Sequence, residues 1–247
     1  MTATRTLSPA VAARWAGIGY LALFALAIFA NFAVRTSIVV ADDPAATMAG
    51  IADNEVAFRA GIGAFILIAA IDVGIAWALH VLLRPTGELR SLLAAWLRLT
   101  YTVLLGAAVT FMAIALHLAT AGDAVAGLGD EARAAWTGTA MEAFDVTWLV
   151  GLVLFGLHLV VVGRILVDTR LAPRALGVLL AVAGVAYIVD TFAHVLLPDY
   201  ASVADVMLVV VALPSMVAEM WFAVWLLARA PRRARALEAR TPQPVAA

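Results

Sequence analysis

Six apolar stretches dominate this chain, and each is long enough to cross a lipid bilayer. They cover residues 15–38, 60–83, 99–119, 144–167, 174–197 and 206–228. A bilayer core about 30 Å thick requires about 20 apolar residues in a helix that rises about 1.5 Å per residue. Mean hydropathy is +1.01 and 65% of the residues are hydrophobic, which excludes a soluble globular protein. The sequence therefore predicts an all-α integral membrane protein, a bundle of six transmembrane helices.

The distribution of arginine predicts how this bundle is oriented. The chain has no lysine, and its 16 cationic side chains are all arginine. If every stretch crosses the bilayer, only Arg35, Arg59 and Arg133 lie on the side opposite the two termini. Loops rich in arginine stay in the cytoplasm. We therefore expect a plasma-membrane protein with both termini cytoplasmic (N-in/C-in).

The length of the chain limits its domain organisation and its partners. With 247 residues, six spans leave no room for a separate soluble domain. We expect one transmembrane domain over residues 1–230 and a disordered basic cytoplasmic tail over 231–247. Juxtamembrane arginine is typical of contact with anionic lipid, so the expected partner is the bilayer, with a small lipophilic ligand as a second candidate and no nucleic acid. The absence of cysteine excludes disulfides and thiolate metal sites.

The loops and small residues predict further local structure. Residues 45–54 are expected to form a short surface helix after the first span, and 130–141 a helix that leads into the fourth. The longest loop is expected over 120–143. The spacing of Gly177 and Gly184 is typical of close packing between membrane helices.

Three ionisable residues lie near the middle of their spans. Asp72 is in the second span, His158 in the fourth and Glu219 in the sixth. Charges at this depth are expensive and commonly mark function. We interpret the three as a candidate intramembrane polar site whose carboxylates, if they face each other, titrate as a coupled pair. Hydrogen bonding between helices, with no function beyond structure, is the alternative.

A second set of polar residues lies near the outer ends of the spans. This predicted outer-leaflet polar cluster comprises Glu55, Arg59, His117, Asp145, Asp190 and His194. Asp190 and His194 are spaced i, i+4 and share a helix face. A histidine and a carboxylate in this arrangement can hold a metal, so His117, Asp190 and His194 are candidate metal ligands. The alternative is a set of interfacial charges that pair with each other and with water.

Within this set, Arg59 is expected to form an ion pair. An arginine near the membrane requires a carboxylate to offset its desolvation. We expect Arg59 to lie within reach of a carboxylate from another outer segment, with Glu55 and Asp190 as the leading candidates. We expect Arg59→Leu to destabilise the protein more than Arg133→Leu.

Several segments resemble a bacterial multi-pass membrane family catalogued as domain of unknown function 4386. They are Asn-Glu-Val-Ala-Phe-Arg-Ala-Gly at 54–61, Phe-Gly-Leu-His-Leu at 155–159, Ala-Pro-Arg-Ala-Leu-Gly-Val-Leu-Leu at 172–180 and Leu-Pro-Asp-Tyr at 197–200. The resemblance covers about residues 14–227, and its matching polar positions are Glu55, Arg59, Asp72, Asp145, Asp190 and Glu219. His158 is outside the family pattern. The resemblance implies a six-helix membrane protein and no activity.

Three functions fit these observations. The first is the binding or transport of a small molecule or lipid, with protonatable carboxylates at Asp72 and Glu219. The second is a metal-assisted intramembrane hydrolase that uses His117, Asp145, Asp190 and His194. The third is a non-enzymatic membrane interaction subunit. The sequence identifies neither a cofactor nor an oligomeric state, and the choice between enzyme and non-enzyme stays open.

Overall fold

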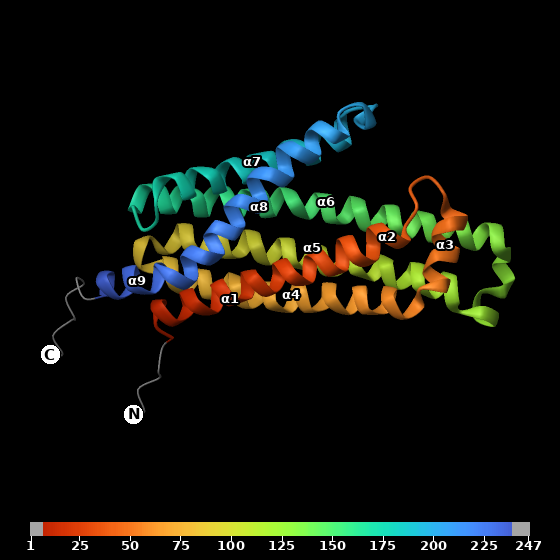
Figure 1. The fold of residues 1–247 in the computed structure, drawn as a ribbon, viewed down its shortest axis with the longest axis horizontal. Helices are drawn as coiled ribbons and strands as arrows, with labels where there is room; N and C mark the ends of the chain where they lie inside the picture. Colours follow the sequence, from red (N-terminus) through yellow and green to blue (C-terminus); the bar gives the residue numbers. More distant parts are fainter. Residues whose placement is uncertain (1–6, 239–247) are drawn as a thin grey trace, which may run out of the picture. The chain divides into compact units, whose positions relative to one another are not determined.

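The computed structural model describes residues 7–238, and they are almost entirely helical (Figure 1). Six helical segments in these residues are long and apolar enough to cross a membrane. They are Pro9–Ile38, Glu55–Thr86, Glu88–Thr120, Gly129–Thr169, Arg174–Leu196 and Ala204–Ala228. The predicted all-α fold with six spans is therefore confirmed, while the N-in/C-in orientation stays a prediction.

The helices follow one another through short connections. They are α1 (Pro9–Ala27), a π-helical segment (Ile28–Arg35), α2 (Thr36–Ile38), α3 (Pro44–Asp53), α4 (Glu55–Leu83), α5 (Glu88–Thr120), α6 (Gly129–Thr169), α7 (Arg174–Leu196), α8 (Ala204–Ala228) and α9 (Ala230–Glu238). Tight helical turns at Arg84–Thr86, Gly122–Leu128 and Tyr200–Ser202 complete the connections. The helix expected over 45–54 is confirmed as α3, whose first turn is capped by the Asp43 carboxylate accepting from the Ala46 N–H at 2.9 Å.

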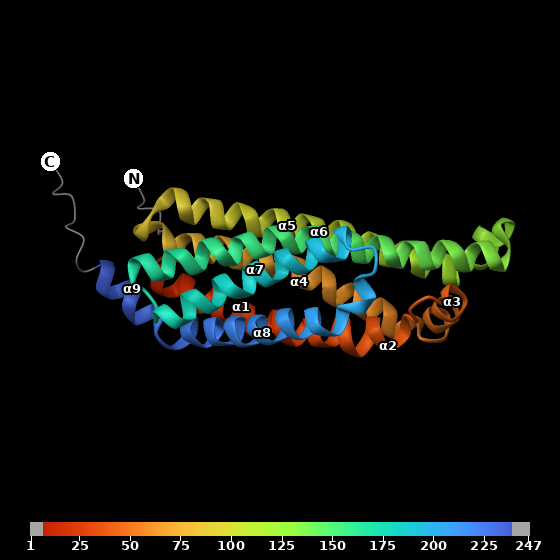
Figure 2. The ribbon, with the colours of Figure 1, turned by 90° about the horizontal axis from the view of Figure 1, so that it is seen from above.

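Two boundaries differ from the sequence expectation. The helix expected over 130–141 is confirmed as the start of α6 at Gly129, so the connection expected over 120–143 is shorter than predicted. The tail expected to be disordered from residue 231 instead forms α9 through Glu238, and residues 239–247 lie outside the described part. Helix α9 buries Ala230 and Ala234 and exposes its arginines, so packing of its alanine face stabilises it. Figure 2 shows α9 turning away from the axis of α8.

By its internal contacts the chain divides into two compact units, and the single transmembrane domain stays a prediction. Unit 1 comprises residues 1–21, 73–99 and 152–247, and unit 2 comprises 22–72 and 100–151. The boundaries fall inside α1, α4, α5 and α6.

Unit 2 has an apolar core in which aromatic and small side chains interlock. Phe58, Met112 and Phe144 are fully buried there. Phe65 packs edge-to-face on Phe144 at a ring distance of 5.5 Å. Gly61 allows the close approach of the first span, because a Cβ at this position would lie 2.7 Å from Val34 Cγ1.

Unit 1 is held together by a close crossing of α6 and α7. Gly156 faces Gly184, and Gly163 faces Gly177, so that a Cβ on Gly163 would lie only 2.4 Å from the Gly177 carbonyl oxygen. The two glycine pairs are seven residues apart on each helix, which fits an antiparallel crossing. The packing role expected for Gly177 and Gly184 is confirmed. Helix α8 then packs antiparallel to α7 (Figure 1).

Candidate functional site

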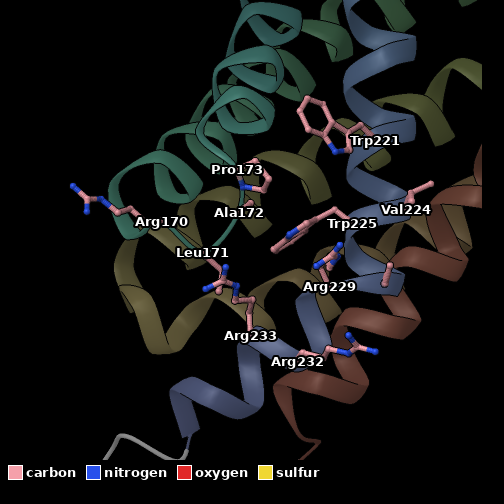
Figure 3. Close-up of a pocket in the computed structure, with 11 residues that line it drawn as sticks. Arg170, Leu171, Ala172, Pro173, Trp221, Val224, Trp225, Arg229, Arg232 and Arg233 are labelled. Carbon is pink, nitrogen blue, oxygen red and sulfur yellow. The ribbon is translucent and has the colours of Figure 1, made fainter.

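Unit 1 contains a cavity of about 650 Å³ between the α6–α7 connection and the end of α8 (Figure 3). Its walls are Arg170, Leu171, Ala172, Pro173, Trp221, Val224, Trp225, Ala228, Arg229, Arg232 and Arg233. We call this cavity the arginine pocket. Four of these eleven residues are arginines and two are tryptophans, while none of the described residues that line it is a carboxylate.

Three features of the local sequence build the arginine pocket. Trp221 and Trp225 are spaced i, i+4, which places both rings on one side of α8. The chain then turns into α9, which brings Arg233 back beside Trp225. Arg170 adopts a φ of +54° and so reverses the chain between α6 and α7. In Figure 3 the Arg229 and Arg233 side chains lie close to Trp225, while Arg170 and Arg232 extend outward.

The chemistry of the arginine pocket is that of an anion site with an amphipathic wall. Arginine presents a planar fork of donors that matches phosphate and carboxylate groups. Tryptophan offers an apolar face and settles at membrane interfaces. Arg229 and Arg233 together with Trp225 can therefore hold a group that joins a negative charge to an apolar body.

A second polar cluster of unit 1 surrounds Arg98, which is 1% exposed. Its guanidinium lies 4.7 Å from the centre of the Tyr20 ring and 5.3 Å from that of Phe155. It donates to the Tyr20 hydroxyl, and its Nη1 lies 3.3 Å from His158 Nε2. We call these residues the Arg98 cluster. Arg98 directly precedes the apolar stretch predicted at 99–119, whereas the structure places it well inside α5.

His158, a candidate of the intramembrane polar site, belongs to the Arg98 cluster. Its Nδ1 lies 2.8 Å from the Ala94 carbonyl oxygen, which can only accept a hydrogen bond. We therefore assign the ring proton to Nδ1, which leaves Nε2 as the acceptor for Arg98. Both contacts fit a neutral ring, and His158 orients the arginine.

The two midplane carboxylates belong to different units. In unit 2, Asp72 is 1% exposed and accepts from the Thr102 hydroxyl at 2.6 Å. In unit 1, half-buried Glu219 accepts from the Tyr187 hydroxyl at 3.3 Å. The Tyr187 ring packs edge-on against Phe155 of the Arg98 cluster. Each carboxylate thus has a hydroxyl partner within its own unit, and their coupled titration stays a prediction.

The predicted outer-leaflet residues fall into several local groups. In unit 1, Tyr200 donates to Asp190 Oδ1 at 2.7 Å, and its ring centre lies 3.9 Å from that of His194. Burial, followed by the hydrogen bond and the negative charge of Asp190, raises the pKa of Tyr200 to about 12.

The remaining outer residues belong to unit 2. Arg59 pairs with Glu55 at 2.7 Å along one helix, and both side chains are largely exposed, so the pair is a surface contact. Asp145 forms an ion pair with Arg35. His117 lies in the last turn of α5. Among the side chains that the structure describes, no three His, Asp or Glu gather as metal ligands, and the His117–Asp190–His194 set stays a hypothesis without structural support.

Sequence reasoning missed Arg98 because it placed the start of the third span too late. Helix α5 begins at Glu88, so Arg98 lies ten residues inside it, about 15 Å along the axis. The apolar run at 92–97 immediately before Arg98 was the available signal. The sequence contains no such signal for the arginine pocket, because this cavity forms only when α9 brings Arg233 beside Trp225.

The fold and its arginine-lined cavity define a polytopic α-helical membrane protein. A family model matches residues 15–230, and the chain belongs to that family, described as Domain of unknown function (DUF4386). Comparisons with curated proteins and with solved structures gave no match.

Proposed function

We propose that the protein binds an anionic amphiphile whose charged group sits in the arginine pocket. The single observation behind this proposal is the combination of four arginines and two tryptophans around one cavity of about 650 Å³. A phosphate or carboxylate would accept from Arg229 and Arg233, and the apolar part of the ligand would contact Trp221 and Trp225. This reading favours small-molecule or lipid binding over the hydrolase and the interaction subunit.

The uneven distribution of arginine between the two sides of the membrane supports binding at the cytoplasmic leaflet. With both termini cytoplasmic, the arginine pocket opens toward the cytoplasmic leaflet of the plasma membrane, where anionic lipids gather. Helix α9 has the composition of an interfacial helix, with buried alanines on one face and exposed arginines on the other. It would draw an anionic headgroup toward Arg233.

Proton-linked transport would extend this proposal from binding to movement of the ligand, and it requires a proton site. Glu219 lies two residues before Trp221 on α8 and is half-buried beside the Tyr187 hydroxyl. Pro214, inside the same helix, removes a backbone hydrogen bond and allows α8 to bend. Proton uptake by Glu219 would then accompany ligand movement, and Glu219→Gln would bind ligand without pH-dependent flux.

Binding is tested with the full chain purified in a neutral detergent. Phosphatidylglycerol, zwitterionic phosphatidylcholine and inorganic phosphate are titrated separately, and the midpoint of thermal unfolding is followed. Phosphatidylglycerol should stabilise the protein at low concentration and phosphatidylcholine should not. Stabilisation by inorganic phosphate at comparable concentrations would assign the arginine pocket to a free anion instead of a lipid.

Matched double variants connect any effect to the arginine pocket. Arg229→Gln with Arg233→Gln removes two pocket arginines, and Arg14→Gln with Arg84→Gln removes two exposed arginines outside both the pocket and α9. Because a hydrogen bond to a charged group contributes about 1.5–3 kcal/mol, the pocket pair should weaken binding at least about tenfold. Equal weakening by both pairs would reduce the effect to general electrostatic attraction and contradict the proposal.

A further inference from the structure

The first membrane span contains a π-helical segment over Ile28–Arg35 in unit 2. The Thr36 N–H donates to the Asn31 carbonyl oxygen, five residues earlier, which is the π-helical spacing. Such segments are rare, and they occur frequently at functional sites. Asn31 and Arg35 are the polar side chains of this segment, four residues apart.

Arg35 connects the π-helical segment to α6. It forms an ion pair with Asp145, and its guanidinium carbon lies 5.2 Å from the Phe144 ring centre and 6.0 Å from that of Trp148. The Arg35 side chain is only 15% exposed. Because Asp145 neutralises its charge, any further group at this place meets a site with no net charge.

Three buried polar atoms of this region make no hydrogen bond to the described residues. They are Asn31 Oδ1, Arg35 Nε and Trp148 Nε1. Among the described side chains, these three are all the buried nitrogen and oxygen atoms found without a hydrogen-bond partner. Burying a polar atom without a partner is expensive, and native proteins avoid it. Their presence on contacting elements points to one shared partner.

The identities of the three atoms define that partner. Arg35 Nε–H and Trp148 Nε1–H are donors, while Asn31 Oδ1 is an acceptor. A hydroxyl oxygen accepts two hydrogen bonds and donates one, which matches all three. A carboxylate would leave Asn31 without a donor and would add charge to a neutral site, and an ammonium group would leave both N–H groups without an acceptor.

We propose that Asn31, Arg35 and Trp148 form a buried binding site for a hydroxyl group in unit 2. Water and the free hydroxyl of a glycerolipid or another alcohol share this chemistry. The site is independent of the arginine pocket, all of whose residues belong to unit 1.

A double-mutant cycle tests whether one group joins the atoms. Trp148→Phe removes the indole N–H and keeps an aromatic ring, and Asn31→Leu removes the acceptor at similar volume. If a hydroxyl bridges them, each variant lowers the thermal midpoint, and the double variant lowers it by clearly less than the sum. If the atoms are unpaired, each single variant leaves the midpoint unchanged or raises it, and the effects add, which would overturn the proposal.

The same cycle separates the two sources of the hydroxyl. It is run in a detergent without free hydroxyl groups and in bilayer discs of phosphatidylglycerol, whose headgroup carries glycerol hydroxyls. Non-additivity in both media assigns the hydroxyl to water, and non-additivity only in the discs assigns it to the lipid. Trp136→Phe, at an exposed tryptophan of unit 2, is the matched control and should add to Asn31→Leu in both media. Asn31→Ala takes the place of Asn31→Leu if that variant does not fold.

Discussion

Tyr200 donates its phenolic hydrogen to Asp190, with 2.7 Å between the hydroxyl oxygen and Oδ1. This bond ties the short turn at Tyr200–Ser202 to α7, the helix that precedes it. The His194 ring lies against the same tyrosine. Two residues that the sequence singled out as candidate metal ligands therefore both contact one phenol, and the contact can be measured by titration.

We expect Tyr200 to ionise near pH 12, above the ordinary value of 10.0. Because folding raises the pKa of Tyr200, its neutral hydroxyl contributes to the stability of the folded state. This contribution is complete below pH 10 and is lost as the pH rises toward 12. Ultraviolet absorbance of tyrosinate measures the ionisation as the difference between the wild type and Tyr200→Phe. Asp190→Asn should lower the pKa only part of the way, since burial is the largest cause of the shift. Asp199→Asn is the matched control and should leave the pKa of Tyr200 unchanged.

Gly163→Ala should destabilise the protein by about 1–3 kcal/mol, a typical cost of overpacking. Its Cβ would lie 2.4 Å from the Gly177 carbonyl oxygen and 2.9 Å from the Ala181 nitrogen, so that α6 and α7 must separate. Thermal unfolding in detergent is the measurement. Gly74→Ala is the control, because nothing lies within 4 Å of its Cβ. Equal stability of the two variants would disprove the close crossing.

Arg98→Lys should destabilise the protein although the charge is kept. A lysine cannot lie flat between the rings of Tyr20 and Phe155 and donate to both Tyr20 and His158. Each lost cation–π contact costs about 0.5–2 kcal/mol. Arg84→Lys, at an exposed arginine, is the control and should be neutral. If chemical denaturation gives both variants the same stability, Arg98 contributes only its charge.

Arg133→Leu should cost more stability than Arg59→Leu, which reverses the order expected from the sequence. Arg133 donates to the Leu118 carbonyl oxygen at 3.0 and 2.8 Å and to that of Ala119 at 3.3 Å, which satisfies the end of α5. The Arg59–Glu55 pair is exposed, and such pairs contribute about 0.3–0.5 kcal/mol. Parallel thermal unfolding of the two variants decides the order, and a larger loss in Arg59→Leu would restore the original expectation.

Single cysteines should report the orientation directly, since the chain contains none. Residues 42–54 and 122–131 are expected outside, and 85–90 and 168–170 inside. An impermeant thiol reagent added to intact cells should label Asp53→Cys and Glu131→Cys, and it should reach Glu88→Cys only after lysis. Labelling of Glu88→Cys in intact cells would contradict the positive-inside assignment.

The six helices were predictable from the sequence because hydropathy over about 20 residues is a local property. The surface helix at 45–54 was predictable for a similar reason, since Asp43 and Pro44 mark a helix start within a few residues. The packing glycines were also recognisable, because small residues at regular spacing have few other uses in a membrane helix.

The polar clusters depend on contacts between distant residues, and hydropathy could not reveal them. In the sequence, Arg98 looks like an arginine at the end of a span. In the structure, Tyr20 and Phe155 from two other helices enclose its guanidinium. The predicted outer cluster combined residues by depth alone, and depth does not tell which side chains face each other. The arginine pocket requires a chain reversal at Arg170 and the return of Arg233 beside Trp225.

The division into two units has a consequence for the order in which the protein can be made. Unit 2 ends at Gly151, whereas unit 1 needs the first 21 residues, a central segment and everything from Leu152 onward. During synthesis, unit 2 can complete its core while α7 and α8 are still absent. Phe155 and His158 lie on α6, so they are made before α7 and α8. A nascent chain arrested after the fourth span therefore contains one complete unit, while the second unit has the residues of the Arg98 cluster but still lacks α7 and α8.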